Sequence, residues 1–211
     1  RLEQALDCFS RAIDLDPEFA PALAGLADSL AVAGFYGLSR PLVVLPKARA
    51  AAERAVDLDD TLAEAHSARG TVHAWLAWDW DVAEREFTRA LALDPNVAIT
   101  HAFYGITLAT MGRVEEAAAE AEKATALDPL SALVLFLAAA IYHGIRQQGR
   151  SIENSTNALA LDPGCTLATW MLSVALSEAG RHDEAIDAGE RGVQMTDRNG
   201  FFVAILGHAP G

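Results

Sequence analysis

The chain has 211 residues, 52% hydrophobic and 21% charged, so it is too apolar to be disordered and long enough to bury a continuous core. Its 16 Lys and Arg against 29 Asp and Glu give a formal net charge of −13, which disfavours nucleic acid and anionic membranes as partners, since both carry negative charge. The longest wholly apolar run, residues 132–142, is too short to span a bilayer.

One short string recurs along the chain and defines its organisation. It places Ala four residues before an Asp, Leu directly before that Asp, and usually Pro directly after it. Pro lacks a backbone donor and disfavours helical geometry in the residue before it, so each helix is expected to stop near the Asp. The steps between successive copies are 43, 35, 34, 34 and 35 residues, and the Asp residues are Asp16, Asp59, Asp94, Asp128, Asp162 and Asp197.

This spacing predicts a chain of helices only, arranged in pairs. The first element, residues 2–15, is expected to be a lone second helix, and five full pairs follow it. A further first helix is expected to begin at Gly200 and run to His208. The first helices of the five pairs are expected to start near Pro21, Thr61, Asn96, Ser131 and Thr166, and the second helices near Pro46, Asp81, Val114, Ser151 and His182.

Local signals mark the helix ends. Thr61 with Glu64, and Asp81 with Glu84, have the spacing of capping boxes, which predicts that Thr61 and Asp81 cap their helices. Gly112 and Gly180 fall where the first helix of a pair must end and turn. The step of 43 residues holds an insertion of about nine residues around residues 36–46, which is apolar and is therefore expected to pack against the fold.

The repeat resembles the tetratricopeptide family, whose period is 34 residues. Its second-helix pattern of Ala, Phe, Ala and Pro is matched twice, and Tyr104, Gly105 and Leu108 match its first-helix pattern. Arg69, Ser151 and Ser155 depart from it, as do Gly189 and Gly192. The resemblance implies an all-α, right-handed α-solenoid of about five repeats with a half repeat at each end, forming one domain over residues 1–211. The two second-helix matches are Ala5, Phe9, Ala12 and Pro17, and Ala83, Phe87, Ala90 and Pro95.

At a finer level, residues 19–28 and 78–87 are similar to one bacterial subset of these repeats. That subset forms the C-terminal part of multidomain signalling proteins, behind adenylate cyclase, winged-helix or kinase domains. The resemblance implies that the chain is a fragment of a longer, cytoplasmic protein and that it regulates the attached domain.

Candidate chemistry is sparse. His66 and His73 share a helix face, but no Cys or carboxylate completes a metal site at ligand spacing. Asp79 and Asp81 flank Trp80, and the simpler interpretation of Asp81 is a helix cap rather than an acid–base group. No phosphate-binding loop or nucleophile elbow is present. We therefore expect no catalytic site, no metal and no cofactor.

The concave face of the first helices is the candidate binding site, because the resemblance places peptides there. At 100° per residue, a second face of these helices is apolar and lacks the Lys and Arg that grip a peptide carboxylate. The alternative is that the curvature of the array covers these side chains. The candidate residues are Ile99, Ala102, Phe103, Ile106, Leu133, Phe136, Ala140, His143, Leu167, Trp170 and Val174.

The sequence therefore favours a protein-interaction module that binds an apolar or helical peptide segment in this groove. The partner is expected to be a protein or peptide, including the other domains of the parent protein. The alternative is a homodimerisation module of a transcriptional regulator or cyclase that has no separate peptide ligand. An enzyme domain is a third hypothesis, and no constellation of residues supports it.

Overall fold

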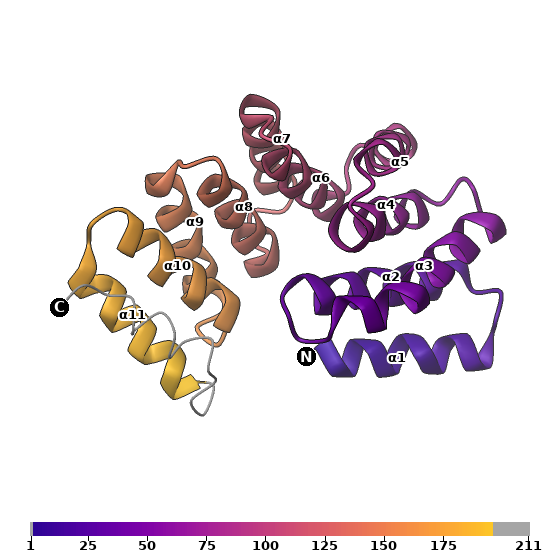
Figure 1. Ribbon diagram of the computed structural model, residues 1–211, viewed down its shortest axis with the longest axis horizontal. Coiled ribbons are helices and arrows are strands. Elements are labelled where there is room, and N and C mark those ends of the chain that lie inside the picture. Colours follow the sequence, from indigo (N-terminus) through magenta and orange to yellow (C-terminus); the bar gives the residue numbers. More distant parts are fainter. Residues whose placement is uncertain (1, 196–211) are drawn as a thin grey trace. The chain divides into compact units, whose positions relative to one another are not determined.

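The computed structural model describes residues 2–195, and every regular element in that range is helical (Figure 1). The predicted all-α fold of helix pairs is confirmed, while the expected helix at 200–208 lies outside the described residues. The elements are α1 Leu2–Leu15, α2 Ala20–Phe35, α3 Pro41–Leu58, α4 Ala63–Val72, the π-helical turn η1 His73–Ala77, α5 Trp80–Leu93, α6 Ala98–Thr110, α7 Val114–Leu127, α8 Ala132–Gly144, α9 Gln148–Leu161, α10 Thr166–Glu178 and α11 His182–Met195.

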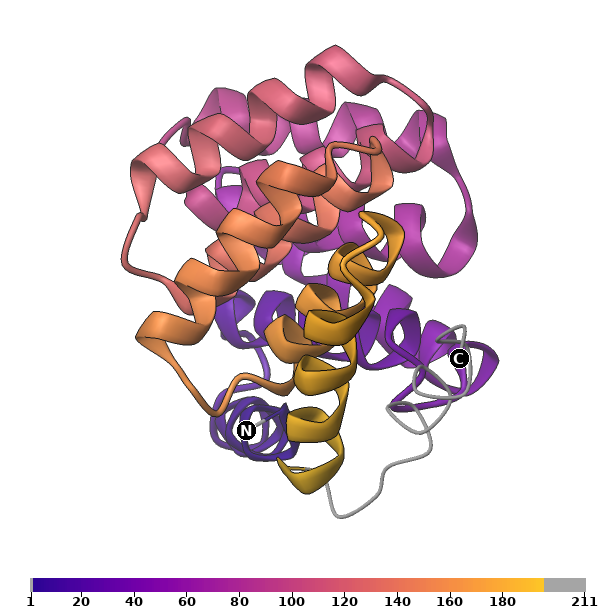
Figure 2. The same ribbon diagram turned by 90° about the vertical axis from the view of Figure 1, so that its left-hand side faces the viewer.

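The chain divides into two compact units, Arg1–Thr107 and Leu108–Gly211. In the first unit, α2 packs against α1, α3 and α4, and α4 packs against α5. In the second unit, α8 packs against α7, α9 and α10, and α10 also packs against α9 and α11 (Figures 1 and 2). The first helices α2, α4, α8 and α10 thus touch both their own second helix and a neighbouring pair. The expectation of one uninterrupted domain over 1–211 stays a prediction.

The repeated Ala is fully buried in each of four second helices. Ala55, Ala90, Ala124 and Ala158 each lie in the last turn of a second helix, and each is 0% exposed. A side chain of one methyl group lets two helices approach closely, whereas any larger side chain would force them apart. The spacing of this Ala therefore fixes where neighbouring helices meet.

The Asp of the string ends its helix by an interaction of its own. The Oδ1 atom of Asp59 accepts a hydrogen bond from the backbone N–H of Thr61 at 2.9 Å. Asp16, Asp94 and Asp162 do the same two residues on, at 2.9–3.0 Å. Such turns compete with the helix for backbone donors. They explain why α3 ends at Leu58 even though Asp60 stands there in place of Pro.

The turn from a first helix to its second helix contains one left-handed residue in every pair. Its φ is 69° at Gly37, 57° at Trp78, 76° at Gly112, 61° at Arg146 and 76° at Gly180. The last four are 34 residues apart. The sequence indicated this turn at Gly112 and Gly180 only, because Gly adopts positive φ without strain. Trp78 and Arg146 hold the same conformation at a cost.

Both predicted capping boxes are wrong by one or two residues. Helix α4 follows Leu62, and the Thr61 hydroxyl donates to Asp59 Oδ1 at 2.7 Å instead of capping the helix. Helix α5 follows Asp79, whose Oδ1 accepts from the Val82 N–H at 3.3 Å. Asp81 therefore lies inside the first turn, where its charge still suits the positive end of the helix dipole.

The nine-residue insertion differs from its expectation. It lengthens the two helices around it, so that α3 begins at Pro41 rather than near Pro46, and only residues 36–40 remain as a loop. Val44 is buried, but Leu38, Leu42 and Val43 are 60%, 85% and 69% exposed. The insertion therefore does not pack down as a whole, because the face of α3 that carries Leu42 and Val43 has no helix against it.

Asp28 on α2 is an ionisable group inside the first unit. Its Oδ1 atom is inaccessible to solvent and has no hydrogen-bond partner among the described residues. Burial raises the pKa of Asp28 to about 7, and the neighbouring Thr71 hydroxyl offsets this only in part. The ionised form is disfavoured because removal from water penalises charge.

We expect Arg146→Gly to stabilise the protein by about 0.5–1 kcal/mol, because it removes left-handed strain at an exposed site while adding chain entropy to the unfolded state. The matched control is Gly112→Ala, whose added methyl group meets no atom within 4 Å, so that only the backbone conformation is penalised. It should lose about 1 kcal/mol. Denaturant unfolding of both variants measures this, and a destabilised Arg146→Gly contradicts it.

Asp28 should make stability pH-dependent. The folded chain holds the Asp28 proton more tightly than the unfolded chain, whose Asp titrates near pH 4, so this contribution favours folding at low pH and declines as the pH rises to about 7. Asp28→Asn should remove the decline and raise stability at about pH 8 by up to about 4 kcal/mol. Melts of both proteins across this range test it, and a constant difference between them contradicts it.

Candidate functional site

Helix α10 carries a partly exposed apolar stripe. Leu167, Trp170 and Val174 are all half-buried and follow one another at intervals of three and four residues, so they share one face of the helix. Leu172 and Leu176 lie on the opposite face, where they pack with Ala185 and Ala188 of α11 and with Ile152 and Leu159 of α9. The stripe thus faces away from the core of its own helix pair.

Helix α8 packs beside α10 and continues this surface. Leu133 is 53% exposed, and Ala140 and His143, seven and ten residues further on, are half-buried. Phe136 is different, because it is fully buried. Helical phase had placed Phe136 with the others, but neighbouring side chains cover it, so it supports the surface from below and does not belong to it.

A polar cluster closes one end of the α8–α10 stripe. The Nδ1 atom of His143 lies 3.4 Å from Gln148 Oε1 and 3.7 Å from Glu178 Oε2. The Gln148 amide donates to the same Glu178 oxygen at 2.6 Å. The three side chains come from the end of α8, the start of α9 and the end of α10. They bind these helix ends together, and none of the three is a Lys or Arg.

Four candidates lie in the first unit, on α6. Ile99 is half-buried, whereas Ala102, Phe103 and Ile106 are buried and form part of the core. These three cannot contact a partner directly, so their expected place on an open groove is not what the structure shows. Phe103 packs edge-on against Trp75 at 4.9 Å between ring centroids, and Trp75 packs against Phe35 at 4.6 Å.

That aromatic row was not anticipated, although Trp75 was available as a signal. It joins α2, η1 and α6, the first helices of three successive pairs. Trp75 is buried, while Phe35, at the end of α2, remains 41% exposed. The row therefore stiffens the first-helix layer and leaves one ring at the surface.

A buried ionic network couples α4 to α5. Glu86 accepts from Arg69, and its Oε2 atom lies 2.7 Å from His66 Nδ1. The other ring nitrogen of His66 lies 2.9 Å from the carbonyl oxygen of Asp60. Burial raises the pKa of Glu86, but the hydrogen bonds from Arg69 and His66 outweigh it and leave the pKa lowered. The network explains why Arg69 can stand where the repeat usually has Leu.

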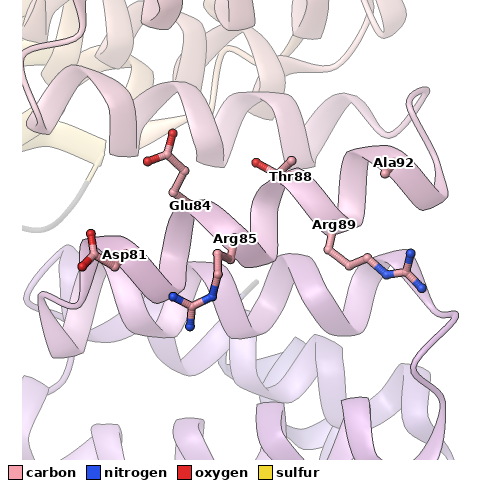
Figure 3. Close-up of a pocket in the computed structure, with 6 residues that line it drawn as sticks. All are labelled: Asp81, Glu84, Arg85, Thr88, Arg89 and Ala92. Carbon is pink, nitrogen blue, oxygen red and sulfur yellow. The ribbon is translucent and has the colours of Figure 1, made fainter.

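An open hollow of about 670 Å³ lies along α5. Figure 3 shows Glu84 and Thr88 on one side of the helix and the guanidinium groups of Arg85 and Arg89 on the other, so these groups do not converge on one point. Glu84 also accepts a hydrogen bond from the Tyr104 hydroxyl at 3.3 Å. Catalysis needs a nucleophile or acid within reach of a partner group, and the hollow offers no such pair.

Within residues 2–195, no group of three or more His, Cys, Asp and Glu side chains is placed to hold a metal ion. In the same range, no helix combines the length and apolarity that crossing a membrane requires.

Comparison with solved structures identifies the fold. The chain resembles YrrB, described as a TPR protein with an unusual peptide-binding site, at 17% identity over 95% of this chain and 98% of that chain, with a TM-score of 0.57. It resembles Cut9–Hcn1 of the APC/C at 17% identity over 100% of this chain and 40% of that chain, with a TM-score of 0.74. It resembles Pseudomonas aeruginosa pilF at 20% identity over 85% of this chain and 80% of that chain, with a TM-score of 0.62.

Sequence comparison identifies the family. No curated protein sequence is significantly similar to this chain. A family model described as tetratricopeptide repeat matches residues 74–132 and 150–199, which is over half of the chain. The matched ranges do not begin and end with the helix pairs, since the first match starts inside η1 and ends at the first residue of α8. The chain therefore belongs to the tetratricopeptide repeat family.

Proposed function

We propose that the chain is a protein-interaction module that binds an apolar or helical peptide segment along the α8–α10 stripe. The observation that carries this is a row of large apolar side chains at the surface. Leu133 on α8 is exposed, and Leu167, Trp170 and Val174 are half-buried on the face of α10 opposite to its packed one. Leaving such surface in water is unfavourable by about 25 cal/mol per Å², so covering it with a partner is favourable. Trp in particular is enriched at binding surfaces.

The chemistry of the stripe selects the guest. It contains no Lys or Arg, so nothing in it can neutralise a peptide carboxylate. The side chains recur at intervals of three and four residues on α10 and of seven and three residues on α8, which suits the ridge of an amphipathic guest helix. At one end, the His143–Gln148–Glu178 cluster offers polar atoms to a guest backbone that emerges from the stripe.

Two further points support this proposal. YrrB, which shares the fold, is a protein with a peptide-binding site. The sequence of residues 19–28 and 78–87 resembles the C-terminal repeats of bacterial multidomain signalling proteins. We infer that the chain is the regulatory part of such a protein, of the adenylate cyclase or winged-helix type, that it works in the cytoplasm, and that the guest belongs to the parent or to another protein.

Leu133→Glu should weaken partner binding at least about tenfold, because it introduces an uncompensated charge into an apolar contact. The matched control is Leu130→Glu, three residues earlier and 79% exposed, which lies in the loop before α8. Because both side chains are largely exposed, neither variant should shift the melting temperature appreciably.

The partner is found first by photo-crosslinking from position 133, and its affinity for both variants is then measured by calorimetry. Equal affinities of Leu133→Glu and Leu130→Glu for that partner contradict the proposal. Sedimentation of the purified chain tests the alternative, which is that the chain is a homodimerisation module. A dimer that Leu133→Glu dissociates shows that the stripe is a homodimerisation surface.

A further inference from the structure

A second apolar surface lies at one edge of the first unit. We define the turn-edge patch as Phe35, Leu38, Leu42, Val43 and Trp78. Leu42 and Val43 are the most exposed of them, and Trp78 is 64% exposed. Gly37 and Trp78 are the left-handed residues of two successive turns, and η1, which Trp78 ends, packs against both α2 and α3. The turns of stacked helix pairs lie at the same edge of a repeat array.

The backbone at Trp78 adds a second observation. A left-handed conformation is unfavourable for a residue with a side chain, and glycine avoids this cost at the equivalent turns, Gly112 and Gly180. The Trp78 ring gains little burial in return, since it is 64% exposed, and it lies edge-to-face with the Trp80 ring at 5.4 Å between centroids. The turn follows a π-helical segment, a distortion frequent at functional sites. Trp78 and Arg146 share this conformation, but only the turn at Trp78 follows a π-helical segment and presents a large apolar ring to solvent.

The charges around the patch are unusual for this chain. Between Ser29 and Ala52 there is no Asp or Glu, while Arg40, Lys47 and Arg49 are all exposed. None of these three cations has a carboxylate within 4.0 Å among the described residues, whereas Arg54 pairs with Glu18. The net charge of the whole chain is −13, so the patch is a basic island on an acidic protein.

Two acidic groups, Asp79 and the exposed Asp81, follow Trp78 at the start of α5. Asp79 caps α5 through the Val82 N–H and lies 3.5 Å from His73 Nδ1. Burial and the charge of Arg49 lower the pKa of His73, while Asp79 partly offsets them. Arg49 therefore acts on this edge from α3, and the cations of the patch are not neutralised from η1.

We propose that the turn-edge patch binds an amphipathic helix of another polypeptide whose apolar stripe is flanked by Asp and Glu. On α3, Leu42 and Val43 lie one to two turns before Lys47 and Arg49 on the same exposed side, which matches an apolar ridge with an acidic rim. Elsewhere the acidic surface repels such a guest, so opposite charge selects this edge. An anionic membrane fits less well, because a plane brings its charge against the whole acidic molecule.

The probe is a synthetic helical peptide of about 18 residues, with a Leu stripe and a Glu rim, labelled for fluorescence anisotropy. Its partner probe has the same sequence with Lys in place of Glu. The acidic peptide should bind the chain about tenfold more tightly than the basic one, and its affinity should fall as salt is added. Weaker binding of the acidic peptide, or binding of neither, overturns the proposal.

Two double variants locate the contact. Arg40→Glu with Lys47→Glu should reverse the preference between the two peptides, and Leu42→Ser with Val43→Ser should weaken the acidic peptide about tenfold. All four side chains are exposed, so melting temperatures should be unchanged. Matched controls in the second unit are Arg191→Glu and Leu130→Ser, which should leave both affinities as they are.

Each other occupant gives its own result. If Leu133→Glu abolishes binding of the acidic peptide and the patch variants do not, the peptide lies on the α8–α10 stripe and the turn-edge proposal is wrong. If the Arg40 and Lys47 reversal releases the chain from phosphatidylserine vesicles while neither peptide binds, the ligand is a membrane. If the Leu42 and Val43 variant dissociates a dimer in sedimentation, the occupant is a second copy of this chain.

Discussion

The close approach of helices at Ala55, Ala90, Ala124 and Ala158 sets the geometry on which the rest of the chain depends. Alanine brings helices together but supplies little apolar area of its own. The area must come from larger residues, and many of these lie on the first helices. A first helix such as α8 is apolar nearly all round, so it has large side chains left over after the core is filled. The partly exposed stripe is a consequence of this division between small and large residues.

Short-range chemistry was predictable, and long-range packing was not. Helix α1 has the predicted bounds, and α7, α10 and α11 begin at the predicted residues, because Asp, Pro and Gly act on the backbone next to them. The predicted caps at Thr61 and Asp81 are wrong because the helices begin one or two residues away from the expected start. The Thr61 hydroxyl donates to Asp59 instead, and Asp79 rather than Asp81 accepts the capping hydrogen bond of α5. The prediction that Phe136 lies on the open surface is wrong for a different reason. Helical phase gives the direction of a side chain but not what lies opposite it.

The same distinction explains what the sequence did not reveal. Arg69 reads as a defect in the repeat, and its partner Glu86 lies 17 residues away on another helix. An Arg and a Glu at core positions of different helices can be recognised as an ion pair only when the two helices are known to touch. A polar pair of this kind is costly to bury and strongly destabilising to break, so its value lies in fixing how α4 meets α5. Asp28 offers no such compensation, and its burial acts against folding at neutral pH.

Three departures of the backbone from the regular repeat lie in the first unit. The insertion before α3, the π-helical turn η1 and the left-handed Trp78 all fall at the ends of α2 and α4. An array built only from regular repeats would bury or shorten each of them. In the second unit the equivalent turns contain Gly112, Arg146 and Gly180, and within the described residues none of them has an insertion or a π turn. The two surfaces therefore differ in chemistry. Added salt weakens the charge attraction at the basic patch, because it shortens the Debye length, which is about 10 Å at 0.1 M salt. Contacts at the uncharged stripe depend on buried apolar area and persist. Ionic strength thus distinguishes the two, because it acts on one kind of contact and leaves the other nearly unchanged.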